Sequence, residues 1–472
     1  MSEEFEAVVD RVRERVEPDE DERAALDAAA ETLRERAQQA LADLAVDGEV
    51  LLAGSAARNT WLAGDRDIDL FVSFPPDLDR EKLRSFGLEV GHAVLEDGHE
   101  EFAEHPYVVG EFRGFDVDVV PCYGVESATD IQSSVDRTPF HTRYVDDRLT
   151  PTHASDVRLC KQFLTGIGIY GSNLRTKGFS GYLTELLVLE YGSFRDLLVA
   201  ATDWQPPVHL DPEDHAAQTF SDSLVVIDPT DPERNVAAVL STANVARFQH
   251  YARAMLANPR EELFEPPQRT PLDSETVRER FAERATTPVA IEFEAPDVVD
   301  DQLWPQLERS SDGIASELHR QGFDVFRTDI FVMEGNAVLF FELAVAQRPA
   351  IERHVGPPVH VRVHADAFYE TYATEHRERP DGSGSSETPS QSGPLFGPFI
   401  DEDRYVVERP RQFTTAHEFL DSDALFDVAL GTHIESALEA EYRVLTGEEV
   451  ATLAECFGEQ FARYLSPSPR QN

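Results

Sequence analysis

One segment near the N-terminus combines residue types that suit phosphate binding. The apolar run 50–53 predicts a short buried strand, and Gly54 follows it with no Cβ to block an approaching ligand. Ser55 stands where a helix N-cap is expected, so its hydroxyl and the free backbone N–H groups can donate to phosphate oxygens. Arg58 lies one turn further along and faces the same way. The segment therefore predicts a phosphate site at the start of a helix.

Three aspartates in two later strands suit a hard divalent cation. Asp67 and Asp69 alternate in a strand-like run, so both point to one side of it. The apolar run 114–121 offers Asp116 and Asp118, and we select Asp118 because it lies deeper in that run. Carboxylate oxygens suit Mg²⁺, and two-metal phosphoryl transfer needs carboxylates that bridge the metals. The sequence predicts such a site on Asp67, Asp69 and Asp118, with Mg²⁺ as cofactor.

Each of these signals also has an ordinary structural explanation. A Gly-Ser pair before a helix is common, and Asp-x-Asp pairs in an acidic chain often lie on solvated faces. The combination is more specific, because Gly-Ser, arginine, Asp-x-Asp and a third strand-borne aspartate are hard to obtain together by chance. The set therefore favours a site for a metal-bound nucleoside triphosphate.

The elements that must position these residues follow from the hydrophobic pattern. Residues 2–46 predict two helices interrupted at Pro18, which lead into short strands and helices up to about residue 145. From 152 to 258 the apolar periodicity predicts a helical neck and body. We therefore expect a catalytic head over 1–145 and a helical central domain over 146–260.

The C-terminal third predicts a mixture of strands and helices. Runs 289–293, 323–332 and 337–345 predict strands, the last two joined by a turn at 334–336. Residues 381–393 form a polar Gly/Ser run that predicts a flexible surface loop. We expect an α+β body and tail over 261–472.

The composition limits the class of protein. The 472 residues predict two to four domains, and the net charge is -47. Three residues are lysines, whereas arginine is abundant. This composition is typical of a halophilic protein in molar salt, where the Debye length falls to about 3 Å. Because the charge is spread throughout and 41% of residues are hydrophobic, the chain fits poorly with a nucleic-acid mimic or a disordered acidic tail.

The expected surroundings of the protein follow from the same data. No secretory signal or transmembrane run is visible in the sequence, so we expect a cytoplasmic protein that has no membrane partner. The acidity is unusual for a protein that binds RNA, and phosphate contacts weaken with salt. Any RNA recognition would therefore rest on local arginine clusters, shape and stacking.

The motifs resemble those of the DNA polymerase β-like nucleotidyltransferases and, among these, the archaeal CCA-adding enzymes. One departure is minor, since Asp67 stands where that family often has glutamate. The segments that carry the resemblance are 54–62, 136–142, 166–172, 177–182 and 228–238, with a fainter one at 353–359.

This resemblance implies a fold and an activity. The fold is α+β, with a polymerase β-like head of a small mixed sheet and helices, a helical neck and body, and α+β C-terminal RNA-binding domains. The activity is template-independent addition and repair of the 3′-terminal CCA of tRNA, with CTP and ATP as donors and pyrophosphate released. The implied partners are the acceptor stem and TΨC arm of tRNA, and the resemblance also suggests a homodimer.

Further nucleotide-binding residues follow from the resemblance. Lys161, on a helix predicted over 156–164, would bring a cation to the triphosphate, although it could be a surface lysine. His141 and Tyr170 could be satisfied core residues, and only the resemblance makes them nucleotide ligands. With these, the nucleotide-binding set is Ser55, Arg58, His141, Lys161, Tyr170 and Arg234.

The role of Arg234 is more open than the others. It lies just before a helix predicted over 235–256, and its planar donor fork could read a base edge. It could equally cap that helix, or pair with Asp228 or Asp231. We take Arg234 as the candidate base reader.

Two other functions use the same elements. A poly(A) or oligoadenylate-type polymerase would use the same head with ATP alone, but the segments around His141 and Arg234 disfavour it. A non-catalytic nucleotide sensor or RNA-binding scaffold would usually lack metal carboxylates, whereas all three are present here.

Overall fold

The computed structural model describes residues 3–44, 46–102, 104–333, 335–377 and 396–469. The chain divides into two units, the first comprising Met1–Gln268 with Ser468–Asn472 and the second Arg269–Pro467. The mixture of helices and sheets in both confirms the predicted α+β class. The predicted domain boundaries at residues 145 and 260 remain predictions.

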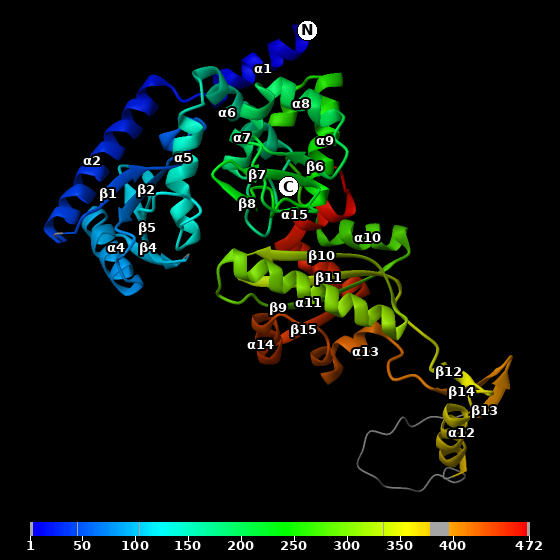
Figure 1. The fold of residues 1–472 in the computed structure, drawn as a ribbon. Coiled ribbons are helices and arrows are strands. Elements are labelled where there is room, and N and C mark those ends of the chain that lie inside the picture. Colours follow the sequence, from blue (N-terminus) through cyan, green and yellow to red (C-terminus); the bar gives the residue numbers. More distant parts are fainter. Residues whose placement is uncertain (1–2, 45, 103, 334, 378–395, 470–472) are drawn as a thin grey trace. The chain divides into compact units, whose positions relative to one another are not determined.

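The first part of unit 1 is a five-stranded sheet in the order β1-β2-β5-β4-β3. β2 and β5 are parallel, and the other neighbouring pairs are antiparallel. Helices α2 and α4 pack against this sheet (Figure 1). Its elements are α1 (Glu3–Val16), α2 (Glu20–Leu44), β1 (Glu49–Leu52), α3 (Gly54–Ala57), β2 (Asp67–Phe74), α4 (Arg80–Val94), β3 (His99–Phe102), β4 (Pro106–Phe112), β5 (Phe115–Tyr123), η1 (Ser134–Arg137) and α5 (Thr138–Asp146).

The two faces of this sheet differ because side chains alternate along its strands. Ile68 and Leu70 of β2 and Val117 of β5 are buried in the same core as Leu33 of α2 and Val90 of α4. The intervening positions of β2 and β5 carry the aspartates. The apolar alternation thus fixes the strands and leaves the carboxylates on the face away from this core.

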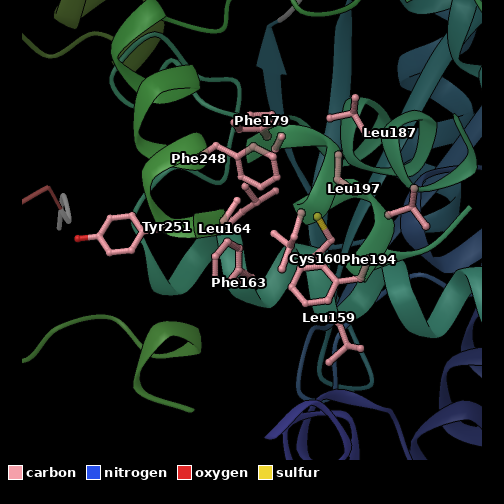
Figure 2. Close-up of a cluster of buried hydrophobic side chains, with 14 of the residues drawn as sticks. Leu159, Cys160, Phe163, Leu164, Phe179, Leu187, Phe194, Leu197, Phe248 and Tyr251 are labelled. Atoms are coloured by element: carbon pink, nitrogen blue, oxygen red, sulfur yellow. The ribbon is translucent and has the colours of Figure 1, made fainter. Parts of the chain in front are cut away.

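The second part of unit 1 is built around a phenylalanine-rich core. Phe163, Phe179, Phe194 and Phe248 are fully buried, and their rings gather between helices (Figure 2). Phe5 of α1 packs into the same cluster. The elements are α6 (Pro151–Gly166), α7 (Gly181–Tyr191), α8 (Phe194–Thr202), β6 (Val208–Leu210), β7 (Leu224–Asp228), β8 (Asp231–Asn235), α9 (Thr242–Ala257) and η2 (Glu261–Phe264).

This region differs from its predicted helical character. β6, β7 and β8 form a three-stranded sheet, and the helix predicted over 235–256 begins only at Thr242. Asn235 accounts for the difference, because its side-chain oxygen accepts from the backbone N–H groups of Val226 and Ala237 and so holds a turn. Ser241 then caps α9 by accepting from the Asn244 N–H.

Unit 2 contains a four-stranded sheet in the order β10-β11-β9-β15 and a three-stranded sheet in the order β12-β14-β13. β9, β10 and β11 are the three strands expected there. Unit 2 comprises α10 (Ser274–Arg284), β9 (Thr287–Glu294), α11 (Asp300–Gln321), β10 (Asp324–Met333), β11 (Asn336–Val345), β12 (Ile351–Pro358), α12 (Arg362–Arg377), β13 (Phe396–Asp401), β14 (Arg404–Pro410), α13 (Ala416–Leu420), η3 (Asp423–Asp427), α14 (Thr432–Ala440), β15 (Tyr442–Thr446), η4 (Gly447–Leu453) and α15 (Ala454–Leu465).

Two predictions for unit 2 concern residues outside the described ranges. The flexible loop predicted at 381–393 lies entirely outside them, and so does Glu334 of the predicted turn. Gly335, which follows, has φ +82, as a tight strand connection requires. Among the described helices, none has the length and apolar character needed to cross a membrane.

Candidate active site

The parallel pairing of β2 and β5 brings the aspartates together. Asp69 lies opposite Asp118 in the register, and Asp67 lies opposite Asp116. Asp69 and Asp118 are half-buried, whereas Asp67 and Asp116 are exposed. The pairing puts Asp118, rather than Asp116, beside the more buried member of the Asp67–Asp69 pair, in keeping with its selection from the sequence.

These carboxylates repel one another. Burial and the charges of Asp69 and Glu101 raise the pKa of Asp118 to about 6. Burial and Asp67 likewise raise the pKa of Asp69, although Arg58 and Lys161 oppose that shift. Burial, together with neighbouring carboxylates, also raises the pKa of Asp67.

The donor set fits a divalent cation that is also bound by other oxygens. Within the described ranges, no hydrogen bond or ion pair reaches the carboxylates of Asp67, Asp69 or Asp118, so none of the three has a direct cationic partner. The same residues contain no closed group of three or more His, Cys, Asp or Glu ligands. Mg²⁺ usually binds one or two carboxylates and completes its shell with water and phosphate oxygens. This open cluster of oxygen ligands is compatible with such an ion.

The Gly-Ser segment lies directly against the carboxylates. Gly54 has φ +65, and a Cβ on it would lie 1.7 Å from Asp69 Oδ2. The backbone N–H of Ala53 donates to the carbonyl of Asp69 at 2.9 Å. The expectation that Ser55 caps a helix is wrong, because α3 is a single turn whose N-cap position is Ala53. Ser55 is therefore half-buried inside that turn, and its contact with phosphate remains a prediction.

Arg58 and Lys161 meet in a buried polar network. The Arg58 Nε lies 2.8 Å from Glu185 Oε2, and its NH1 donates to Thr142 Oγ1 at 3.1 Å. The Thr60 hydroxyl donates to Glu185 Oε1 at 2.6 Å. The Lys161 Nζ donates to the Thr60 carbonyl at 2.9 Å. Lys161 is only 3% exposed, so it is not a surface lysine.

Tyr170 lies next to this network, close to the first residue of α7. It pairs with Phe179 through a β-bridge, and its phenol is half-buried. A Cβ on Gly181 would lie 3.2 Å from the Tyr170 hydroxyl and 3.8 Å from Lys161 Nζ. Burial and the charge of Glu185 raise the pKa of the phenol, which therefore keeps its proton. Gly181 thus leaves room for two polar groups at one point.

His141 and Arg234 meet on the carboxylate of Asp228. His141 Nε2 lies 2.8 Å from Asp228 Oδ2, and Arg234 NH1 donates to the same oxygen at 2.7 Å. Arg234 belongs to β8 and does not precede a helix, so the capping alternative is wrong. Of the two pairings expected for Arg234, the structure shows the one with Asp228, whereas Asp231 pairs with Arg137.

The structure thus arranges the predicted residues in three adjacent groups within unit 1. Asp67, Asp69 and Asp118 form the first. The second comprises Arg58, Lys161 and Tyr170, and the third His141 and Arg234. The charges of Arg58 and Lys161 act on Asp69, and the charge of Arg58 also acts on His141.

Two buried carboxylates organise these groups; sequence reasoning missed Glu185 and named Asp228 only as a possible partner of Arg234. Glu185 and Asp228 are both 0% exposed. Glu185 stands within an apolar helix, and Asp228 ends a strand of buried apolar residues. An acidic residue inside such a run is the signal that could have identified each of them, since buried charges are usually paired.

Comparisons with known proteins agree with this geometry. Residues 31–141 match the family model described as a nucleotidyltransferase domain, which confirms the predicted polymerase β-like head. Residues 155–265 match the second domain of tRNA nucleotidyltransferases, and residues 284–447 match the C-terminal domain of CCA-adding enzymes.

Similar proteins span the whole chain. The CCA-adding enzyme of Haloarcula marismortui is 56% identical over 99% of this chain and 100% of its own length. That of Halorubrum lacusprofundi is also 56% identical, over 98% of this chain and 99% of its own. The more distant enzyme of Methanosarcina barkeri is 38% identical over 94% of each chain. The chain therefore belongs to the archaeal-type CCA-adding enzymes, as its motifs predicted.

Proposed function

We propose that this enzyme adds and repairs the 3′-terminal CCA of tRNA without a nucleic acid template, taking CTP and ATP and releasing pyrophosphate. Its family membership supports the reaction. The observation that carries the assignment of residues is the register that pairs Asp69 with Asp118 beside Gly54. A poly(A)-type polymerase is not favoured, because the full-length relatives are CCA-adding enzymes.

In this proposal Asp67, Asp69 and Asp118 would hold Mg²⁺ through their carboxylate oxygens, which have no direct cationic partner. Magnesium held there would lower the pKa of the primer 3′-hydroxyl and would neutralise charge on the triphosphate and the departing pyrophosphate. The carboxylates orient the reacting oxygens for in-line attack on the α-phosphate, which is catalysis mainly by positioning.

The triphosphate lies along the Gly54–Ala57 turn in this scheme. Ser55 and the backbone N–H groups donate to its oxygens. Arg58 and Lys161 supply positive charge from within the protein, held in place by Glu185 and Thr60. Tyr170 remains protonated and can donate a hydrogen bond to the ligand.

In this scheme Arg234 reads the base, and His141, which is bound to the same carboxylate, orients the nucleotide beside it. A pocket built to hydrogen-bond C and A rejects U and G, because a wrong base leaves buried polar groups without partners. Arg234 is the candidate reader because its side chain is 34% exposed, so part of its donor fork can meet a ligand.

The remaining partners are also proposals. We place the acceptor stem and TΨC arm of tRNA on the C-terminal domains, which would recognise A-form shape rather than bases hidden in the deep major groove. We further propose a homodimer that works in the cytoplasm.

The test uses purified protein in molar KCl with Mg²⁺ and tRNA that lacks its last three nucleotides. Each labelled nucleoside triphosphate is supplied alone and in combination. Addition of two C residues and one A, followed by arrest, is the expected result. Long tails of A would instead indicate a poly(A)-type polymerase, and tRNA binding without incorporation would indicate a scaffold.

A further inference from the structure

Asp228 is a buried carboxylate that has no role in the reaction proposed above. Five donors converge on it. Oδ2 accepts from His141 at 2.8 Å and Arg234 at 2.7 Å. Oδ1 accepts from the N–H and hydroxyl of Thr230 at 3.0 and 2.8 Å, and from the Tyr182 hydroxyl at 3.3 Å. A carboxylate with this many donors is saturated and stays ionised.

The first consequence concerns the His141 ring. The ring stacks on Tyr182, with centroids 4.0 Å apart and an interplanar angle of 15°. Because Asp228 is ionised, the His141 nitrogen that faces it, Nε2, carries a proton, and burial keeps the ring neutral by lowering its pKa. Nδ1 is then left as an acceptor. Asp228 and Tyr182 together fix both the tautomer and the plane of the ring.

The second consequence concerns the Arg234 guanidinium. One of its nitrogens is held by Asp228, while the side chain also lines a groove of about 730 Å³. Arg137 and Gln218 line the same groove. A guanidinium anchored at one end presents its other donors in a fixed direction, whereas a free one rotates. The donor pattern offered to the groove is therefore set by Asp228.

We propose that Asp228 is a positioning residue for nucleobase selection, which aligns His141 and Arg234 through one shared carboxylate oxygen. This inference rests on the proposed function, since it assigns the fidelity of that same site. Asp228 touches neither the base nor the reacting atoms, and it acts through the two side chains that it holds.

A merely structural role would have a different signature. Asp228 contacts side chains of α5, α7 and β8, so its loss could lower stability without touching fidelity. The ratio of kcat/KM for a correct nucleotide to that for a wrong one is insensitive to the fraction of folded enzyme. That ratio is therefore the decisive readout.

The experiment compares wild type, Asp228→Asn and Asp156→Asn on tRNAs that lack three nucleotides or one. Asp156 of α6 is the control, because it is also a buried carboxylate paired with an arginine, Arg13, but does not line the groove of Arg234. We expect Asp228→Asn to lower selectivity for CTP and ATP over UTP and GTP by about tenfold, the value of one well-made base contact. Asp156→Asn should change it by less than about twofold.

The outcomes separate this inference from the proposed function. If wild type does not build CCA, the proposed function fails before any variant is compared. If wild type builds CCA and Asp228→Asn retains wild-type selectivity, the positioning role of Asp228 is wrong. Equal losses of selectivity in both variants would also overturn it.

A second set of variants applies if Asp228→Asn does not fold. His141→Asn and Arg234→Gln are measured singly and together. Because both side chains donate to one oxygen, their losses of selectivity should overlap, and the double variant should lose little more than the worse single one. Losses that simply multiply would mean that the two residues act independently, contrary to the proposal.

Discussion

Two sets of carboxylates in unit 1 have opposite surroundings. Asp69 and Asp118 lie beside each other, and burial together with the charges of neighbouring carboxylates raises their pKa values. Glu185 and Asp228 are more deeply buried, yet both are paired, Glu185 with Arg58 and Thr60 and Asp228 with His141 and Arg234. Burial would raise the pKa of Asp228, but hydrogen bonds from His141 and Thr230 hold it well below its ordinary value.

The difference shows how carboxylate side chains can either bind a cation or hold other side chains in place. Clustered carboxylates without partners leave negative charge that a cation can neutralise, at some cost to the stability of the metal-free protein. Buried carboxylates that are already paired instead hold cationic side chains in place. The same isosteric change to an amide should therefore have opposite effects in the two sets.

The largest expected effect is on catalysis. Asp118→Ala removes a metal ligand and should lower nucleotide incorporation by about a thousandfold or more, since metal stabilisation is worth several kcal/mol in the transition state. Gel assays of incorporation and of tRNA binding measure the two activities separately, and tRNA binding should stay nearly intact.

Asp116→Asn is the matched control for this change. Asp116 lies on the same face of β5 but is exposed, so its variant should stay within about threefold of wild type. If Asp118→Ala kept activity within about tenfold of wild type, the metal assignment would be wrong.

The second effect is on stability. Glu185→Gln leaves Arg58 buried without its counter-charge and should lower the free energy of unfolding by about 3 kcal/mol. Urea unfolding at constant KCl measures it. Glu213→Gln, at an exposed pair with Arg148, should change it by less than about 0.5 kcal/mol. Equal losses of unfolding free energy in the two variants would show that the buried pair of Glu185 with Arg58 contributes no more to stability than an exposed pair.

The smallest effect has the opposite sign. Without metal, Asp118→Asn should raise the free energy of unfolding at pH 7 by about 1 kcal/mol, after allowance for solvent screening. Since the folded pKa of Asp118 is raised to about 6, wild type binds a proton more tightly when folded. Wild type should thus gain stability as pH falls from 7 through 6, and the difference between the two proteins should shrink.

Unfolding in urea with EDTA at several pH values tests this last prediction. Asp116→Asn again serves as the exposed control. A variant that is less stable than wild type at pH 7 would show that repulsion at Asp118 is not a significant cost.

The local sequence pattern predicted the strands that carry the carboxylates. Ile68, Leu70 and Val72 alternate with Asp67 and Asp69, and such an alternation fixes which side chains share a face. The pattern did not reveal α3 as a single turn, because backbone packing of Gly54 against Asp69 decides that geometry.

The partners of the buried charges could not be predicted from local pattern. Glu185 meets Arg58 across 127 positions of sequence, and His141 meets Asp228 across 87. Such pairs depend on tertiary packing. The late start of α9 was missed for a related reason, since the apolar spacing after Asn235 suits a helix, whereas the hydrogen bonds of the Asn235 side chain hold a turn there.

The burial of Lys161 makes this enzyme unusually easy to follow by chemical labelling. The chain has three lysines, of which Lys82 has a 63% exposed side chain and Lys161 is enclosed between Thr60 and the start of α7. An amine-acylating reagent should modify Lys82 in the folded protein and reach Lys161 only when the packing of α6 against Thr60 and the start of α7 opens. The Lys161 amine is thus a built-in reporter of local opening next to the nucleotide site, with Lys82 as its internal reference.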